Sequence, residues 1–535
     1  MIIRHFLAFL LILTLVPAAL AESVLHRGNL LEPESLDPQK ATGLPAAMIF
    51  YDLYEGLLTR GQDGLPRPGL ASYWEVSDDG LLVTIHLRDG LRWSNGTPVT
   101  ADDVVFTFRR LADPAQDGRQ GNLVWMLKYG RSITSGRVTD TSLLGVTAVD
   151  ARTVRFTLEQ PYPFFVALLA YPMLGILPEA PLTALGTAFF KPGNLVSSGA
   201  YKLAEWIPGQ YVKLVRNSYY RDDAHTQIDS VYFHVSANED AELQRFRAGE
   251  LDVTFNLTPT ALPWARASAA GSLRESALLG TYNYYFNMTR EPWRSNAPLR
   301  RALSMVIDRE ALARDVMNGL AEPATSFVPT SVRGPYVPAR PYWAGWSQSR
   351  RVAEARRLLA EAGYPQGRGL IVDLLYNSAD SNGRIARAIA GMWKQSLGVE
   401  TTLSEQPWKD YLTARQSKTY PGLVRGGTIA AYDDPNAFLE LLRSEMGTGN
   451  PAGFEHRPFD ALMAAANRET DPVRRLGLLG RADQIATDES VSIPLYVGRR
   501  YRLVSPRVQG WVANNLDVNP SRFLSIAPQV AEKRP

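Results

Sequence analysis

Arg425 is the residue of this sequence whose type and surroundings most clearly require a charged partner. It stands alone in a run of small and apolar residues between Gly422 and Ala431. Burying a guanidinium without a partner is costly, so this side chain must meet an anion. The anion is either a bound ligand or a nearby Asp or Glu in a structural salt bridge, and the sequence leaves both interpretations open.

Side chains for covalent catalysis are poorly represented. The sequence has no cysteine, no Gly-x-Ser-x-Gly elbow and no phosphate-binding Gly-x-x-x-x-Gly-Lys loop. The pairs Asp102-Asp103 and Asp222-Asp223 are sequence neighbours, which is typical of solvated turns and helix starts. No two histidines have metal-ligand spacing. We therefore expect that the protein is not an enzyme and that it binds no metal and no cofactor. The histidines are His5, His26, His86, His225, His234 and His456.

The first residues have the pattern of a secretory signal. Arg4 and His5 precede an apolar run over 6–16, and Ala19-Leu20-Ala21 fits the small-x-small cleavage rule. The run is too short for a stable membrane span. We therefore expect a signal peptide at 1–21 and a periplasmic protein. Without a cysteine for lipid attachment, we expect no lipoprotein.

The pattern of the remaining chain predicts an α/β protein. Apolar residues alternate over 83–87 and 154–158, as in half-buried strands. Pro298 opens a predicted helix, and a second helix is predicted over 349–362 with Gly363 as its C-cap. The length of 535 residues predicts about three domains. A net charge of +3 on this length gives nucleic-acid binding no support.

Several segments together resemble the periplasmic oligopeptide-binding proteins of dipeptide and oligopeptide ABC importers, solute-binding protein family 5. The resemblance covers about 24–527, and its longest signature is a hairpin and helix over 86–104, where Trp93 and Asn95-Gly96 have structural roles. The similar segments are 50–58, 86–104, 110–114, 194–203 and 376–377.

The resemblance implies a two-lobed α/β fold with two crossing hinge strands and an extra α/β domain inserted near the N-terminus. It implies a ligand enclosed between the lobes. The expected parts are lobe I (24–67, 191–282 and 499–535), the extra domain (68–190) and lobe II (283–498).

The resemblance also implies which residues bind the ligand. The segment 422–435 is similar to the principal ligand strand of the family. The expected ligand contacts are Arg425, Trp408, Tyr129, Asn382, Arg384, Glu55, Thr428, Ile429, Ala431 and Asn256.

Three positions depart from the family pattern. Ala431 stands where the family anchors a peptide amine on an aspartate, and Asp433 would share its face only if the strand continued. Asn382 replaces a histidine that can meet a carboxylate, and Arg384, two residues on, could supply a cation instead. Met317 stands where a lysine is used for short peptides.

The expected partners are a peptide or peptide-like solute and an inner-membrane ABC permease, with the protein a monomer. Because Ala431 lacks a carboxylate, a non-standard solute is an alternative: a muropeptide, an opine-like compound, or an acylated or sugar-conjugated amino acid. A peptidase and a chaperone-like protein are further alternatives of other classes.

Overall fold

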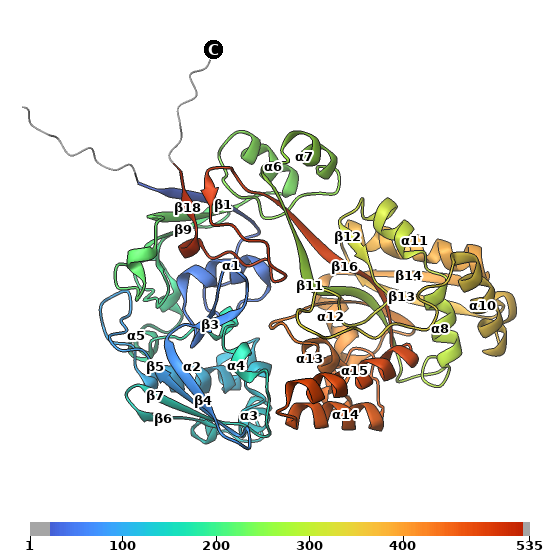
Figure 1. The fold of residues 1–535 in the computed structure, drawn as a ribbon, viewed down its shortest axis with the longest axis horizontal. Coiled ribbons are helices and arrows are strands. Elements are labelled where there is room, and N and C mark those ends of the chain that lie inside the picture. Colours follow the sequence, from blue (N-terminus) through green and yellow to red (C-terminus); the bar gives the residue numbers. More distant parts are fainter. Residues whose placement is uncertain (1–21, 528–535) are drawn as a thin grey trace, which may run out of the picture.

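The computed structural model describes residues 22–527, which form two lobes joined by two long strands (Figure 1). The expected signal peptide at 1–21 lies outside the described residues. Within residues 22–527, no helix combines the length and the apolar character that a membrane crossing requires.

The joining strands are β11 (Leu273–Phe286) and β16 (Ser492–Leu503), which pair antiparallel along most of their length. A strand of 14 residues extends about 46 Å, enough to run from one lobe into the other. In Figure 1 they connect the blue and green half of the molecule to the yellow and orange half. The expected two-lobed α/β fold with two crossing strands is confirmed.

Lobe I is built on a four-stranded sheet in the order β1-β10-β9-β8, in which β1 and β10 are parallel. Two short ribbons, β2 with β3 and β17 with β18, lie beside it. Its strands are β1 (Val24–Leu30), β8 (Tyr201–Ile207), β9 (Tyr211–Arg216), β10 (Ser230–Val235), β2 (Leu58–Arg60), β3 (Pro66–Pro68), β17 (Val508–Gln509) and β18 (Ser525–Ile526), and its helices are α1 (Gly43–Leu53), α6 (Glu239–Arg247) and α7 (Leu262–Ser268).

The inserted domain has an antiparallel sheet in the order β4-β5-β7-β6. Its signature hairpin buries Trp93, and Gly96 takes a positive φ of 85° in the turn. The buried side chains of this domain and of lobe I form one continuous core, so the boundary at 67/68 stays a prediction. Its elements are β4 (Ala71–Val76), β5 (Leu82–Leu87), α2 (Ala101–Ala112), α3 (Gly130–Thr134), β6 (Val146–Asp150), β7 (Thr153–Thr157), α4 (Phe165–Leu168) and α5 (Glu179–Leu185).

Lobe II has its own core around a six-stranded sheet in the order β12-β16-β11-β15-β13-β14. Both predicted helices form here, as α8, capped by the Asn296 side chain, and α10, capped by Ser347 and followed by Gly363 at φ 94°. Its elements are α8 (Ala297–Met305), α9 (Arg309–Ala311), β12 (Ala321–Pro323), α10 (Gln348–Glu361), β13 (Ile371–Asn377), α11 (Asp380–Leu397), β14 (Glu400–Gln406), α12 (Trp408–Ser417), β15 (Leu423–Ile429), α13 (Asn436–Leu439), α14 (Arg457–Arg468) and α15 (Pro472–Asp488).

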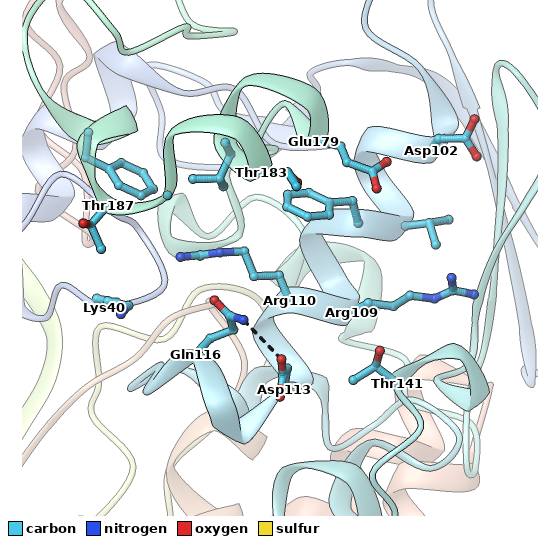
Figure 2. A pocket seen from close by; sticks show the side chains of 15 residues that line it. Lys40, Asp102, Arg109, Arg110, Asp113, Gln116, Thr141, Glu179, Thr183 and Thr187 are labelled. Atoms are coloured by element: carbon cyan, nitrogen blue, oxygen red, sulfur yellow. Dashed lines mark hydrogen bonds between the residues drawn. The ribbon is translucent and has the colours of Figure 1, made fainter.

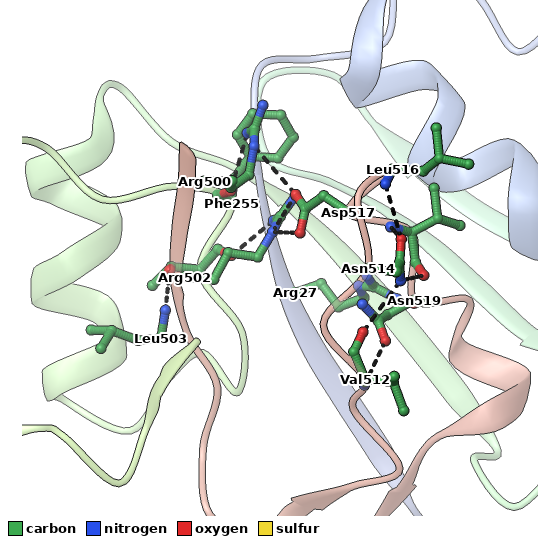
Figure 3. A network of polar contacts seen from close by, with 12 residues as sticks. Arg27, Phe255, Arg500, Arg502, Leu503, Val512, Asn514, Leu516, Asp517 and Asn519 are labelled. Atoms are coloured by element: carbon green, nitrogen blue, oxygen red, sulfur yellow. Dashed lines mark hydrogen bonds and ion pairs between the residues drawn. The ribbon is translucent and has the colours of Figure 1, made fainter. Parts of the chain in front are cut away.

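A buried ion pair fixes strand β16 to lobe I. Arg502 binds Asp517 with Nε and Nη2, at 3.0 and 2.7 Å, and its Nη1 donates to the Thr254 carbonyl oxygen at 3.0 Å (Figure 3). Arg500 reaches the same carboxylate at 3.2 Å. The side chains of Arg502 and Asp517 are only 3% and 4% exposed, so this pair holds one end of the crossing strand firmly in lobe I.

Candidate functional site

Arg425 lies on strand β15, in the middle of the lobe II sheet and next to the crossing strand β11. It pairs with Tyr284, and Gly427 pairs with Tyr282, so these side chains share one face of the sheet. The guanidinium carbon of Arg425 is 4.8 Å from the ring centroid of Tyr282, which stacks on Tyr496 of β16. Tyrosine rings therefore form the wall beside this cation.

Arg425 has no carboxylate partner among residues 22–527. Within the described part of the chain, its one side-chain hydrogen bond runs from Nη1 to Asn377 Oδ1 at 3.5 Å, and its Nε is buried without a partner. The Tyr284 hydroxyl is also buried without a partner, and burial raises its pKa well above the usual value, so it stays neutral. Of the two interpretations left open by the sequence, the structural salt bridge is not formed within residues 22–527.

The edge of strand β15 beyond Arg425 is open. Strand β13 pairs only with Leu423 and Val424, and the next residues pair only with β11 on the other side. The Ala430 N–H donates to the Leu279 carbonyl of β11, so by strand alternation the backbone groups of Gly427 and Ile429 point to the unpaired side. An extended ligand can hydrogen-bond to this edge.

Both ends of this open edge are occupied by side chains. The Tyr411 hydroxyl donates to the Arg425 carbonyl oxygen, and Arg60 Nη2 donates to the Ala431 carbonyl oxygen at 2.7 Å. Only the backbone groups of Gly427 and Ile429 remain between them. The open edge therefore suits a short ligand.

Gly427 gives the guanidinium its position. An added Cβ at this residue would lie 3.2 Å from Arg425 Nη2, so the arginine side chain runs along the strand over the glycine. Ile429, on the same face, is 55% exposed. Arg425, Gly427 and the exposed Ile429 thus follow one another on one face of strand β15.

A cavity of about 240 Å³ lies at the Ile429 end of this row. Strand β15 ends at Ile429, and the following residues bend toward lobe I. Helix α1, the inserted domain, the end of β15 and the C-terminal segment all contribute to its wall. The lining residues are Gly43, Leu44, Ala47, Met48, Tyr51, Tyr171, Pro172, Ile429, Ala430, Ala431, Leu516 and Val518.

The condition under which Asp433 would share the face of Ala431 is not met. The strand does not continue to Asp433, and its carboxylate is committed elsewhere. Oδ2 accepts from Arg333 Nε at 2.6 Å and from Asn515 Nδ2 at 2.8 Å, and Oδ1 accepts from the Arg333 backbone N–H at 3.1 Å. Because the carboxylate is saturated and 8% exposed, it is not available to a ligand amine.

Arg384 also needs a correction. Residues 380–397 form helix α11, in which residues two apart point about 200° away from each other. Asn382 is 5% exposed and faces the sheet, so Arg384 faces solvent. Arg384 therefore does not supply the cation that Asn382 lacks.

Asn382 belongs to the network that surrounds Arg425. Its Oδ1 accepts from the Tyr282 hydroxyl at 3.0 Å, and its Nδ2 donates to the Asn377 carbonyl and Oδ1 at 3.0 and 3.1 Å. The amide oxygen and the amide nitrogen of Asn382 both have hydrogen-bond partners within lobe II. Asn382 therefore orients Tyr282 and Asn377, which in turn contact Arg425.

Glu55 is not at this site, contrary to our expectation. Its carboxylate is 1% exposed and pairs with Arg221 at 2.8 Å, while the Tyr220 hydroxyl donates to it at 3.1 Å. Asn256 lies half-buried beside Phe255, whose ring packs against Arg500 at 5.1 Å. The structure thus places Glu55 inside lobe I and Asn256 at the lobe I end of the crossing strands.

The remaining expected residues lie around the site. Trp408 is 55% exposed and stacks on Tyr411, whose hydroxyl binds the Arg425 carbonyl. Thr428 lies opposite Thr281 and on the other face of β15 from Arg425. Tyr129 is exposed on the inserted domain, two residues before Arg131, which reaches Glu445 of lobe II at 3.6 Å. Met317, where the resemblance implies a lost lysine, packs against the lobe II core.

Sequence reasoning missed Arg60, Asn377 and Tyr411, and it did not name the tyrosines of β11 as site residues. Arg60 lies two residues after the similar segment 50–58, and this position was the one signal for it. Its guanidinium is 1% exposed, donates to carbonyl oxygens of Gly64 and Ala431, and forms no ion pair among residues 22–527.

A larger cavity of about 660 Å³ lies in the inserted domain along helix α2 (Figure 2). Its central cation, Arg110, is already paired with Asp37 at 2.6 Å and with Gln39 at 2.5 Å. We assign no ligand to this cavity. Within 22–527, no group of three or more His, Asp or Glu side chains could hold a metal ion.

Comparison with known proteins agrees with this architecture. The family described as Bacterial extracellular solute-binding proteins, family 5 Middle, matches residues 66–450. The periplasmic oligopeptide-binding protein OppA of Salmonella typhimurium is 35% identical over 500 residues, which are 92% of this chain and 90% of that protein. An Escherichia coli protein named "Probable deoxycholate-binding periplasmic protein YgiS" is 34% identical over 496 residues, 92% of this chain and 91% of that protein.

A solved structure has about the same sequence identity to this chain. The Escherichia coli murein tripeptide binding protein MppA has a TM-score of 0.83 and 34% identity to this chain, covering 95% of this chain and 99% of that chain. With its two lobes, its crossing strands and this match over most of its length, the chain belongs to the family 5 bacterial extracellular solute-binding proteins.

Proposed function

We propose that the protein is a periplasmic receptor that captures a short peptide or peptide-like solute between its lobes and delivers it to an inner-membrane ABC importer. The names of OppA and MppA refer to peptide binding, and those of OppA and YgiS to the periplasm. The role requires no covalent step. The lobes are proposed to comprise 24–67, 191–282 and 499–535 for lobe I and 283–498 for lobe II, with 68–190 as the added domain, and to close about β11 and β16.

The observation that carries this proposal is the open strand edge beside Arg425, a cation with no carboxylate partner in the described residues. A peptide laid against Gly427 and Ile429 would extend the lobe II sheet by one strand, so its backbone would supply affinity without selecting side chains. A terminal carboxylate would meet Arg425 in a charge-assisted hydrogen bond and fix the register.

Thermal denaturation of the mature chain with a short-peptide library tests the proposal. A ligand present at 100 times its dissociation constant stabilises the folded state by about 2.7 kcal/mol. We expect this stabilisation in the wild-type protein and in Arg384→Gln, and its loss in Arg425→Met. Peptides recovered by mass spectrometry should be intact, since cleavage would favour a peptidase. Equal stabilisation of Arg425→Met would place the ligand elsewhere.

A carboxylate on a large apolar body is a second candidate solute. The apolar cavity at Ala431 favours it, and one relative is named for deoxycholate binding. Calorimetry with monomeric deoxycholate tests this candidate, and saturable binding that Arg425→Met abolishes would support it. The muropeptide alternative stays a prediction from the sequence.

A further inference from the structure

The cavity at Ala431 contains no group that could neutralise an ammonium ion. Among residues 22–527, its lining has no Asp or Glu side chain, and its only side-chain polar groups are the hydroxyls of Tyr51 and Tyr171. Burial raises the pKa of Tyr171 to about 12 and that of Tyr51 above its usual value, so both stay neutral at physiological pH. The wall is otherwise formed by aliphatic side chains, proline and glycine.

The charge next to the cavity is positive. Arg60 touches the Ala431 carbonyl, is fully buried and forms no ion pair among the described residues, and arginine keeps its proton in proteins. The nearest acidic residue along the chain, Asp433, is already neutralised by Arg333. A ligand ammonium placed here would lose its water, find no anion and meet a like charge.

The two ends of the site are separated by a short distance. The Arg425 guanidinium lies over Gly427, and residue 431 is four residues further along, at most about 14 Å away in extended backbone. The cavity volume of about 240 Å³ equals that of about eight water molecules in the liquid. A chain of two or three peptide units with a short acyl group can reach from one end to the other.

We infer that the solute is a carboxylate whose opposite end is uncharged and apolar. Its carboxylate pairs with Arg425, two or three peptide units lie along Gly427 and Ile429, and an acyl group in place of a free amine fills the cavity at Ala431. This inference rests on the proposed function and names its substrate class: short peptides blocked at the amino end. Helix α1 then contributes selectivity, since Leu44 and Met48 contact the blocking group.

Calorimetry with trialanine and N-butyryl-trialanine tests the inference, because both peptides have the same carboxylate. Each methylene buried in an apolar cavity raises affinity about fourfold. We therefore expect N-butyryl-trialanine to bind at least tenfold more tightly than trialanine. In Met48→Ala, which enlarges the cavity, the preferred acyl chain should become longer, as measured with N-hexanoyl-trialanine.

The outcomes separate the two proposals. Equal or tighter binding of trialanine would overturn the inference and leave the peptide receptor standing. Binding of neither peptide would overturn both. Arg384→Gln serves as the matched control, since its side chain faces solvent on α11, and it should preserve the wild-type ratio of affinities.

Discussion

Arg60 of lobe I donates a hydrogen bond of 2.7 Å to the carbonyl oxygen of Ala431 in lobe II. This bond closes one end of the open strand edge and brings a buried positive charge to the position where related receptors are expected to hold an aspartate. The bond also joins the two lobes beside the crossing strands. One arginine thus links the lobes and sets the charge at that end of the site.

Replacing Ala431 by Asp should admit a free amine. A hydrogen bond to a charged group contributes about 1.5–3 kcal/mol, so Ala431→Asp is expected to raise the affinity for trialanine about ten- to hundredfold. The affinity for N-butyryl-trialanine should fall, because the new carboxylate is desolvated by the acyl chain. Calorimetry measures both values. Unchanged trialanine affinity would argue against residue 431 as the amine position.

Arg425→Met should have opposite effects on binding and on stability. Loss of the charged partner should lower the affinity for N-butyryl-trialanine at least tenfold. The affinity for the C-terminal amide of this peptide, a ligand that carries no carboxylate, should change little. The ligand-free variant should unfold at a higher temperature than wild type, because a half-buried cation that has no carboxylate partner among the described residues has been removed. Calorimetry and thermal denaturation of the ligand-free proteins test the two effects. A lower unfolding temperature would contradict the absence of an internal partner.

The sequence predicted the elements whose signals are local. Helices α8 and α10 begin at Asn296 and Ser347 caps and were expected from proline, glycine and apolar spacing within a few residues. The turn at Gly96 followed from the Asn-Gly pair. Such signals depend on residues that are neighbours in the chain, so they can be interpreted without knowledge of the tertiary structure.

The sequence could not predict which charges neutralise one another. Glu55 was expected at the ligand, but its partner Arg221 is 166 residues away, and Asp433 is taken by Arg333, 100 residues away. Arg384 was misplaced because helix α11 begins just before it and turns it away from the site. These assignments depend on tertiary pairing, which composition and spacing do not encode.

The buried pair of Arg502 and Asp517 should stabilise the attachment of strand β16 to lobe I. Breaking a buried ion pair by removing one charge costs about 3–5 kcal/mol, so Asp517→Asn should lower the free energy of unfolding by about that amount. Glu34 and Arg119 form an exposed pair, with side chains 54% and 61% exposed, and Glu34→Gln is the matched control with an expected effect below about 1 kcal/mol. Urea denaturation compares the two variants. Similar small losses in both would show that β16 does not depend on this pair.

Asp483 should make stability depend on pH in lobe II. Its carboxylate in α15 is fully buried, and burial raises its pKa to about 6 although the Tyr336 hydroxyl and the Ala339 N–H each donate to Oδ2 at 2.8 Å. The unfolded chain has an ordinary Asp pKa near 3.8, so between about pH 4 and 6 the folded protein binds more protons than the unfolded one. The free energy of unfolding should therefore fall as pH rises through this window, by up to about 3 kcal/mol.

Asp483→Asn isolates this contribution, because the amide stays neutral at every pH and its oxygen can still accept from Tyr336 and Ala339. Glu242, whose pKa burial raises to about 7, titrates in both proteins and cancels from the difference between them. Urea denaturation at pH 4.5, 5.5 and 6.5 should show the variant gaining stability relative to wild type as pH rises. If the two stability curves stay parallel across this range, the Asp483 carboxyl does not titrate in it, and the donors from Tyr336 and Ala339 outweigh the cost of burial.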